Sequence, residues 1–115
     1  MTPQHAVAVI FTSTRTRIDD EGYARAAWEL EELTREVDGF LMMHAVRDPE
    51  TGDGITVSYW RDEDAALAWK QDATHREAQQ LGRERWYSRY EVHVATVTRT
   101  YAFTRPDDEG IGTDD

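Results

Sequence analysis

The chain has 115 residues, 39% hydrophobic and 31% charged, which is the size and composition of one globular domain. Its net charge of −10 at pH 7 argues against nucleic-acid binding, which needs clustered lysine and arginine. The lack of cysteine excludes disulfides and thiolate chemistry, and no apolar run has the length of a membrane span. We therefore expect a cytoplasmic protein with neither nucleic-acid nor membrane partners.

The first half of the chain predicts two strands with a helix between them. Residues 5–17 read HAVAVIFTSTRTR and begin apolar on both faces, which is typical of a central strand. Asp19 can cap a helix whose apolar spacing continues to Val37, with Gly39 as its stop. Residues 40–46 form a second strand pattern, again apolar on both faces.

The second half predicts a hairpin, a broken helix and a long strand. The Asp, Pro and Gly of residues 47–54 indicate a turn into a third strand, which ends at Trp60. Asp62 can cap the next helix, and we expect that helix to break near Asp72 and restart. The last strand is predicted over residues 88–103.

These elements follow the order β-α-β-β-α-β, which predicts an α+β, ferredoxin-like domain with a four-stranded antiparallel sheet. Both helices of this fold cover the same face of the sheet, whereas three of the predicted strands are apolar on both faces. A monomer would expose this second apolar face, so we expect a homodimer that stacks sheet on sheet. The domain spans residues 1–103, and the acidic residues 104–115 are predicted to form a mobile tail.

Short motifs along residues 6–103 resemble a known family. They are VIFTS at 9–13, DGFL at 38–41, SYW at 58–60, AW at 68–69, His75 and RWY at 85–87. With them the chain resembles the antibiotic biosynthesis monooxygenase (ABM) domain family of the dimeric α+β barrel superfamily. The resemblance implies a monooxygenase, hence an oxidoreductase, that acts on a small aromatic or quinol-like molecule in a pocket between sheet and helices.

Candidate site residues come from this resemblance and from side-chain chemistry. His75 has the intrinsic pKa of a general base, and Trp69 can stack on a planar substrate beside it. Both are candidate catalytic residues. Rings that can stack and polar groups that can bind substrate oxygens are candidates for substrate binding, namely Phe11, Ser13, Thr14, Tyr59, Gln79, Arg83, Trp86 and Tyr87.

Structural roles stay open for several of these residues. A lone histidine on an alanine-rich helix face more often bonds a backbone group than a substrate. Trp86 and Tyr87 lie where a helix is expected to meet a strand, and rings at such a corner are more often part of the core. Trp28 lies off the apolar stripe of its helix, either against its neighbours or in contact with a partner subunit.

Two alternative functions also stay open. Haem-degrading relatives share a tryptophan at Trp69, but their axial histidine, ten residues later, corresponds here to Gln79. Their asparagine late in the first strand corresponds to Ser13 or Thr14. We therefore expect no cofactor, with haem bound through His75 as one alternative. The other is a non-catalytic dimeric module that binds a small hydrophobic molecule.

A metal site is not expected. The four histidines are scattered and have no i, i+4 pair of the kind that binds metal on a helix. His44 and His93 fall in predicted strands, so a contact between them across the sheet or across a dimer interface is one open possibility.

Overall fold

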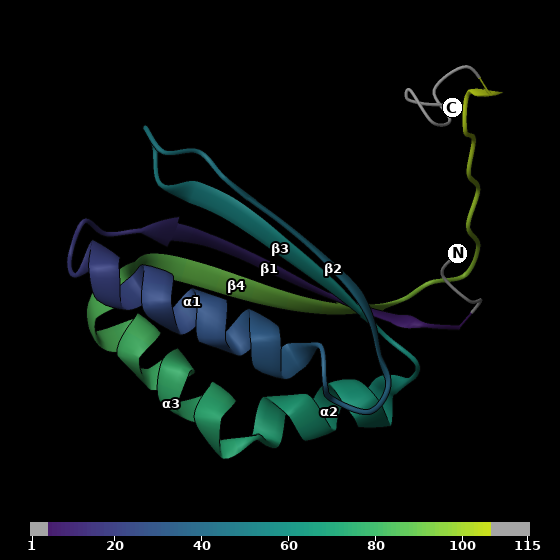
Figure 1. The fold of residues 1–115 in the computed structure, drawn as a ribbon, viewed down its shortest axis with the longest axis horizontal. Helices are drawn as coiled ribbons and strands as arrows, with labels where there is room; N and C mark the ends of the chain where they lie inside the picture. The colour runs from purple at the N-terminus through teal and green to yellow at the C-terminus, as the bar shows by residue number, and fades with distance from the viewer. Residues whose placement is uncertain (1–4, 107–115) are drawn as a thin grey trace.

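The computed structural model describes residues 5–106, which form a sheet with a layer of helices on one of its faces (Figure 1). In chain order the elements are β1 (Val7–Arg15), α1 (Asp20–Thr34), β2 (Phe40–Arg47), β3 (Asp53–Trp60), α2 (Glu63–Gln71), α3 (Ala73–Leu81), the π-helical turn η1 (Gly82–Trp86) and β4 (Tyr87–Thr96). All strand pairs are antiparallel and the sheet order is β2-β3-β1-β4. The predicted ferredoxin-like α+β fold is therefore confirmed.

Helix α1 begins where the sequence predicts but ends earlier. Asp19 has a φ of 58°, and its carboxylate accepts a hydrogen bond from the backbone of the first turn, which caps the helix. The regular helix ends at Thr34, whose hydroxyl donates to the Leu30 carbonyl. The expected continuation toward Gly39 is wrong, because Val37 lies in a tighter connecting turn and packs on the core from there.

The core forms where α2 packs on the middle of the sheet. Trp60, at the end of β3, is only 1% exposed and lies with Val7, Ala65 and Ala66. Its indole N–H donates to the Ser58 hydroxyl at 2.9 Å, so the buried polar group is satisfied. The two alanines have small side chains, and this lets α2 approach the indole closely.

The strand register divides the sheet into two faces. Val9 lies opposite Ser58 and Val94, and Ile10 lies opposite Val57 and His93. Val9 belongs to the helix-facing side, because it packs on the core, and Ile10 belongs to the other side. This second side, here called the open face, carries Ala8, Ile10 and Thr12 of β1, Met42, His44 and Val46 of β2, Ile55, Val57 and Tyr59 of β3, and His93 and Ala95 of β4.

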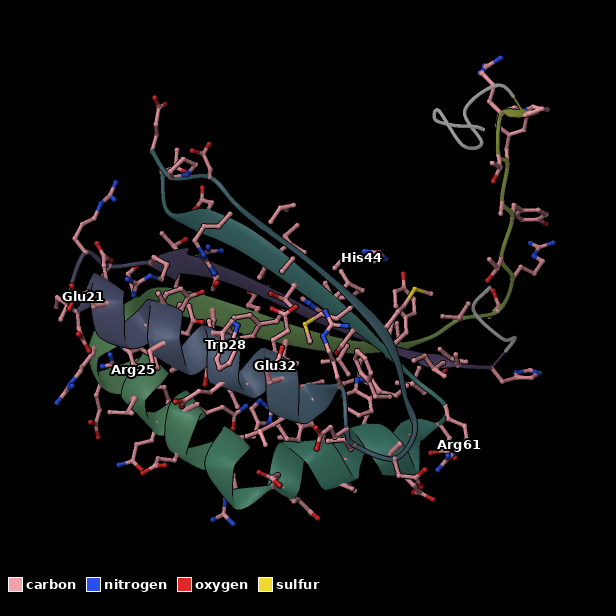
Figure 2. All side chains as sticks on the ribbon, viewed as in Figure 1. Glu21, Arg25, Trp28, Glu32, His44 and Arg61 are labelled. Carbon is pink, nitrogen blue, oxygen red and sulfur yellow. The ribbon has the colours of Figure 1, made fainter. Side chains whose placement is uncertain are left out.

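The helix layer does not cover the open face, and Figure 2 shows His44 pointing away from the helices. Val46 is 73% exposed and Ile55 is 45% exposed. His44 and His93 lie in one transverse row, but β3 and β1 separate them, so the two histidines do not meet across the sheet of one chain.

Strand β4 is shorter than predicted. It ends at Thr96, which lies opposite Val7, the first residue of β1. Val97 still bonds to His5 and Ala6, after which residues 98–106 run away from the body (Figure 1). Most of the expected tail, residues 107–115, lies outside the described residues. Within residues 5–106 no helix has the length and apolarity that crossing a bilayer requires.

Gly39 is required where the chain enters β2. Its φ is 90°, and a Cβ there would lie 2.5 Å from the Cβ of Ala65 on α2. We predict that Gly39→Ala lowers the free energy of unfolding by roughly 2–4 kcal/mol, since both the backbone conformation and the new contact are unfavourable. Urea denaturation would measure this loss. In an Ala65→Gly background the loss should be smaller, and equal losses in the two backgrounds would contradict the proposed steric contact.

Candidate functional site

Trp69 and His75 come together where α2 ends and α3 begins. Their rings stack with centroids 4.8 Å apart and planes 6° apart, and the Nδ1 atom of His75 lies 3.1 Å from the backbone oxygen of Trp69. Because a carbonyl only accepts hydrogen bonds, Nδ1 is the nitrogen that carries the proton in the neutral ring. The Nε2 atom then keeps its lone pair, which is the form that a general base requires.

The surroundings of His75 favour its neutral form. Burial lowers the pKa of His75 below its ordinary value, and Lys70 acts in the same direction. The hydrogen bond to the Trp69 backbone and the charge of Asp72 oppose this effect. The predicted structural role, a bond to a backbone group, is therefore present, and it leaves a neutral imidazole with a basic nitrogen at pH 7.

An apolar strip on the helix-facing side of the sheet stays uncovered. Val92 and Val94 are 45% and 57% exposed, although they share this side with the core residues of β1. Val94 lies beside Val9, which packs on the same core cluster as Trp69, and Val92 lies beside Phe11. The strip is thus an accessible apolar floor beside Val9 and Phe11, on the side of the sheet that carries the core cluster on which Trp69 packs.

Aromatic residues continue this floor beyond Phe11. The Phe11 ring lies 5.4 Å from the Tyr87 ring and 5.3 Å from the Tyr90 ring, measured between centroids. Arg83 donates to the Tyr90 hydroxyl at 3.2 Å. Burial and the neighbouring Tyr23 raise the pKa of Tyr87, against the opposing charges of two arginines, so this hydroxyl keeps its proton at neutral pH. The far end of the floor therefore offers the protonated phenol of Tyr87.

Three residues of this region were not predicted from the sequence, namely Tyr23, Arg15 and Arg47. The Arg15 guanidinium lies 4.0 Å from the centroid of the Tyr23 ring. Arg47 donates to the buried Ser13 hydroxyl at 2.8 Å and to the Tyr23 hydroxyl at 3.3 Å. The tyrosine follows the apolar spacing of α1, but the two arginines stand at strand ends and carry no sequence signal of their own.

The structure separates the predicted site residues into groups. Thr14 and Tyr59 lie on the open face, away from the other candidates, and Thr14 donates there to Asp53 at 2.7 Å. Trp86 is 4% exposed and packs on Tyr23 as a core ring. On the helix-facing side the candidates form two contact groups. One is the Trp69–His75 pair, and the other joins Phe11, Trp86, Tyr87 and Ser13 around Tyr23 and Arg47, with Arg83 added through Tyr90.

Two surface hollows lie apart from the Trp69–His75 pair. One, of about 580 Å³, includes Ser13 and Arg47 and lies at the β2–β3 end of the sheet. The other, of about 450 Å³, includes Gln79 and Arg83 on α3. Neither is lined by Trp69 or His75, so the uncovered strip is the better candidate for the substrate position. Among residues 5–106 no three His, Asp or Glu side chains are placed to hold a metal ion.

Comparison with known proteins decides the family. Residues 7–81 match the antibiotic biosynthesis monooxygenase (ABM) family. The chain belongs to this family. It is 41% identical over 96 residues to the uncharacterized protein YqjZ of Bacillus subtilis, covering 84% of this chain and 82% of that protein. It is 30% identical over 92 residues to the jasmonate monooxygenase ABM of Pyricularia oryzae, covering 79% of this chain and 43% of that protein. The chain thus spans less than half of this second relative.

Solved structures show the same fold. SnoaB, a cofactor-independent oxygenase from Streptomyces nogalater, is similar with a TM-score of 0.70 at 13% identity, covering 84% of this chain and 96% of that chain. A conserved protein from Methanosarcina mazei is similar with a TM-score of 0.72 at 15% identity, covering 82% of this chain and 94% of that chain. The predicted ABM family and its fold are therefore confirmed.

The lowered pKa of His75 predicts how stability changes with pH. Between the folded-state pKa and the ordinary value of about 6.5, the unfolded chain binds a proton that the folded chain does not. The stability that His75 contributes is present above that ordinary value and is lost as pH falls through the folded-state pKa. We predict that His75→Gln, which does not titrate, weakens the pH dependence of the free energy of unfolding between pH 7.5 and 5. Urea titrations of wild type, this variant and the control His5→Gln measure it, and parallel curves for all three would contradict the prediction.

Proposed function

We propose that this protein is an ABM-type monooxygenase that oxidises a small electron-rich aromatic substrate, such as a phenol or a quinol, without a cofactor. Family membership and the similarity to a jasmonate monooxygenase and a cofactor-independent oxygenase support this activity. The observation that carries the proposal is the Trp69–His75 pair, in which a neutral imidazole stacks on an indole, on the side of the sheet that also carries the exposed apolar strip.

In the proposed reaction the Nε2 atom of His75 removes a proton from the substrate phenol. The resulting anion is electron-rich enough to reduce oxygen directly, so the substrate itself supplies the electrons. A ring carbon that bears a hydrogen, ortho or para to the phenolate oxygen, then becomes a carbonyl, and the product is a quinone. Its hydrogen and the phenol proton held by His75 leave with one atom of O2 as water, and the other oxygen atom forms the carbonyl.

Each side-chain group has a defined part in this proposal. The exposed strip of Val92 and Val94 would bury the apolar rings of the substrate and keep water from the anion. Trp69 would hold the substrate plane near the imidazole by stacking. The Tyr87 hydroxyl, whose raised pKa keeps it protonated, would donate to a substrate oxygen at the far end.

The test is oxygen uptake by purified protein over a panel of quinols and activated phenols, with ¹⁸O₂ to show one labelled atom in the product. His75→Gln should lower kcat/KM roughly 10²–10⁴-fold, the usual contribution of a general base. For wild type, kcat/KM should fall as pH drops through the lowered pKa of His75. His5→Gln should behave as wild type.

Other results would redirect the assignment. Uptake unchanged in His75→Gln would remove this residue from the mechanism. Silence across the panel would favour a non-catalytic binding module. A haemin-induced Soret band that His75→Ala abolishes would favour the haem-binding alternative instead.

We also propose that the protein is a homodimer formed by stacking of two open faces. Val46 and Ile55 leave apolar surface bare on this face, and a second copy offers the same surface in return. The distances between sheets in such stacks, about 10 Å, leave room for these side chains to interdigitate.

Light scattering tests the dimer, because the chain mass is 13.3 kDa and a dimer has twice this mass. We predict that Val46→Lys shifts the protein toward the monomer, since two lysines would be buried without partners. The control Ile18→Lys changes an apolar residue of similar exposure, 56%, in the loop before α1, and should leave the dimer intact. A wild-type mass of a single chain would contradict the proposal.

A further inference from the structure

Arg47, the last residue of β2, is a partly buried cation without an anionic partner. Its terminal nitrogens donate to hydroxyl and backbone oxygens, and within residues 5–106 it forms no ion pair with a carboxylate. The more exposed Arg35, Arg61 and Arg85 each have such a pair. Burial of a charge without a counter-charge is costly, whereas an exposed arginine needs none. The distribution of pairs therefore points to an anionic ligand at Arg47.

The sheet builds a fixed place for the Arg47 guanidinium. Arg47 and Ser13 lie on either side of Gly54 in one transverse row of the helix-facing side. A Cβ on Gly54 would lie 2.6 Å from the Cζ atom of Arg47, so the guanidinium lies where a side chain at residue 54 would be. It crosses β3 in this way, donates to the Ser13 hydroxyl at 2.8 Å, and lies 5.7 Å from the ring centroid of Tyr23 and 5.9 Å from that of Tyr87. Ser13, Tyr23, Arg47 and Tyr87 are here called the Arg47 cluster.

The Arg47 cluster has donors and charge for one carboxylate. Ser13 is 2% exposed and accepts from Arg47, and none of residues 5–106 accepts a hydrogen bond from its hydroxyl, so that proton is free to be donated. The Tyr87 hydroxyl is protonated as well. The charge of Arg15 also acts on Tyr87, but Arg15 is paired with Asp20. Two cations and one anion leave a charge of +1, which suits a singly charged carboxylate better than a doubly charged phosphate.

The Arg47 cluster also adjoins the apolar strip. Ser13 lies two residues beyond Phe11 on the same side of β1, and Phe11 lies beside Val92 of the strip. At the other end, Val9 packs on the same core cluster as Trp69. Val9 and Ser13 are four residues apart, about 13 Å along a strand. A flat molecule on the strip with its phenol toward Trp69 would thus direct its opposite end toward Ser13.

We propose that the Arg47 cluster binds a carboxylate of the substrate, which makes that substrate an aromatic acid with its phenol and its carboxylate at opposite ends. The inference rests on the proposed function and names the class of its substrate. Arg47 would supply the charge and hold the Ser13 hydroxyl with its proton toward the ligand. The hydroxyls of Ser13 and Tyr87 would donate to the carboxylate oxygens. Arg47 is therefore a residue that determines substrate specificity, apart from the base His75.

The first test compares an acid with its neutral amide. Calorimetry at pH 7.5 measures the Kd of 6-hydroxy-2-naphthoate and of 6-hydroxy-2-naphthamide, which differ in charge and little in shape. Wild type should bind the acid at least roughly tenfold more tightly than the amide. In Arg47→Gln the two Kd values should become equal, mainly through weaker binding of the acid. Arg47→Lys keeps the charge and should keep part of the preference.

The control is Arg35→Gln, which removes an exposed arginine on α1 and should keep the full preference. Circular dichroism checks that each variant is folded. Equal binding of acid and amide by wild type, or no binding of the acid, would overturn the inference. An unchanged preference in Arg47→Gln would overturn it too.

A second variant tests the position of the guanidinium. Gly54→Ala leaves the charge of Arg47 in place but puts a methyl group where the guanidinium lies. It should reduce the preference for the acid without removing it. A folded Gly54→Ala protein with the full preference would contradict the placement of the ligand beside Ser13.

Oxygen uptake with the same two compounds separates this inference from the proposed function. Equal kcat/KM for acid and amide would overturn the carboxylate site and leave the monooxygenase standing. Binding of the acid that depends on Arg47, without oxygen uptake from any compound of the panel, would support the carboxylate site and count against the monooxygenase.

Discussion

The close packing of α2 on the sheet determines the positions of the groups that matter for function. Trp60 fills the centre of this contact, and the small side chains of Ala65 and Ala66 let the helix approach it. Gly39 extends the constraint to the entry of β2, because only a residue without Cβ fits beside Ala65. With α2 held in this way, its last turn brings Trp69 to the core and sets the point where α3 turns back.

That arrangement reconciles the structural and the catalytic interpretation of His75. Its Nδ1–H bond to the Trp69 backbone oxygen ties the two helices together, which is a structural role. The same bond selects, between the two neutral tautomers, the one with a basic Nε2, and burial lowers the pKa of His75 so that the neutral form persists at pH 7. In the proposed mechanism the structural bond is therefore what prepares the base, as a carboxylate or carbonyl partner does for many reactive histidines.

Local signals in the sequence were sufficient for most of the fold. Caps at Asp19 and Asp62 and the break at Asp72 are determined by neighbouring residues and could be predicted. The end of β4 depends on where β1 begins, far away in the chain. The sequence therefore predicted a strand that continues too far, to residue 103 instead of Thr96. Alternation alone shows that Ser13 and Thr14 cannot face one site, since adjacent strand residues point to opposite sides. The arginines around Tyr23 could not be found, because only tertiary pairing of strand ends brings them to that ring.

The two faces of the sheet divide the proposed functions between them. On the helix-facing side, Val92 and Val94 remain accessible because β4 is an edge strand that the helices cover incompletely. On the open face none of the helices within residues 5–106 covers Val46, and in the proposed dimer a second copy covers it. In the proposed arrangement the open face forms the dimer and the helix-facing strip binds the substrate, so the two functions occupy opposite sides of one sheet. A substitution on one of these sides can then change one function without changing the other.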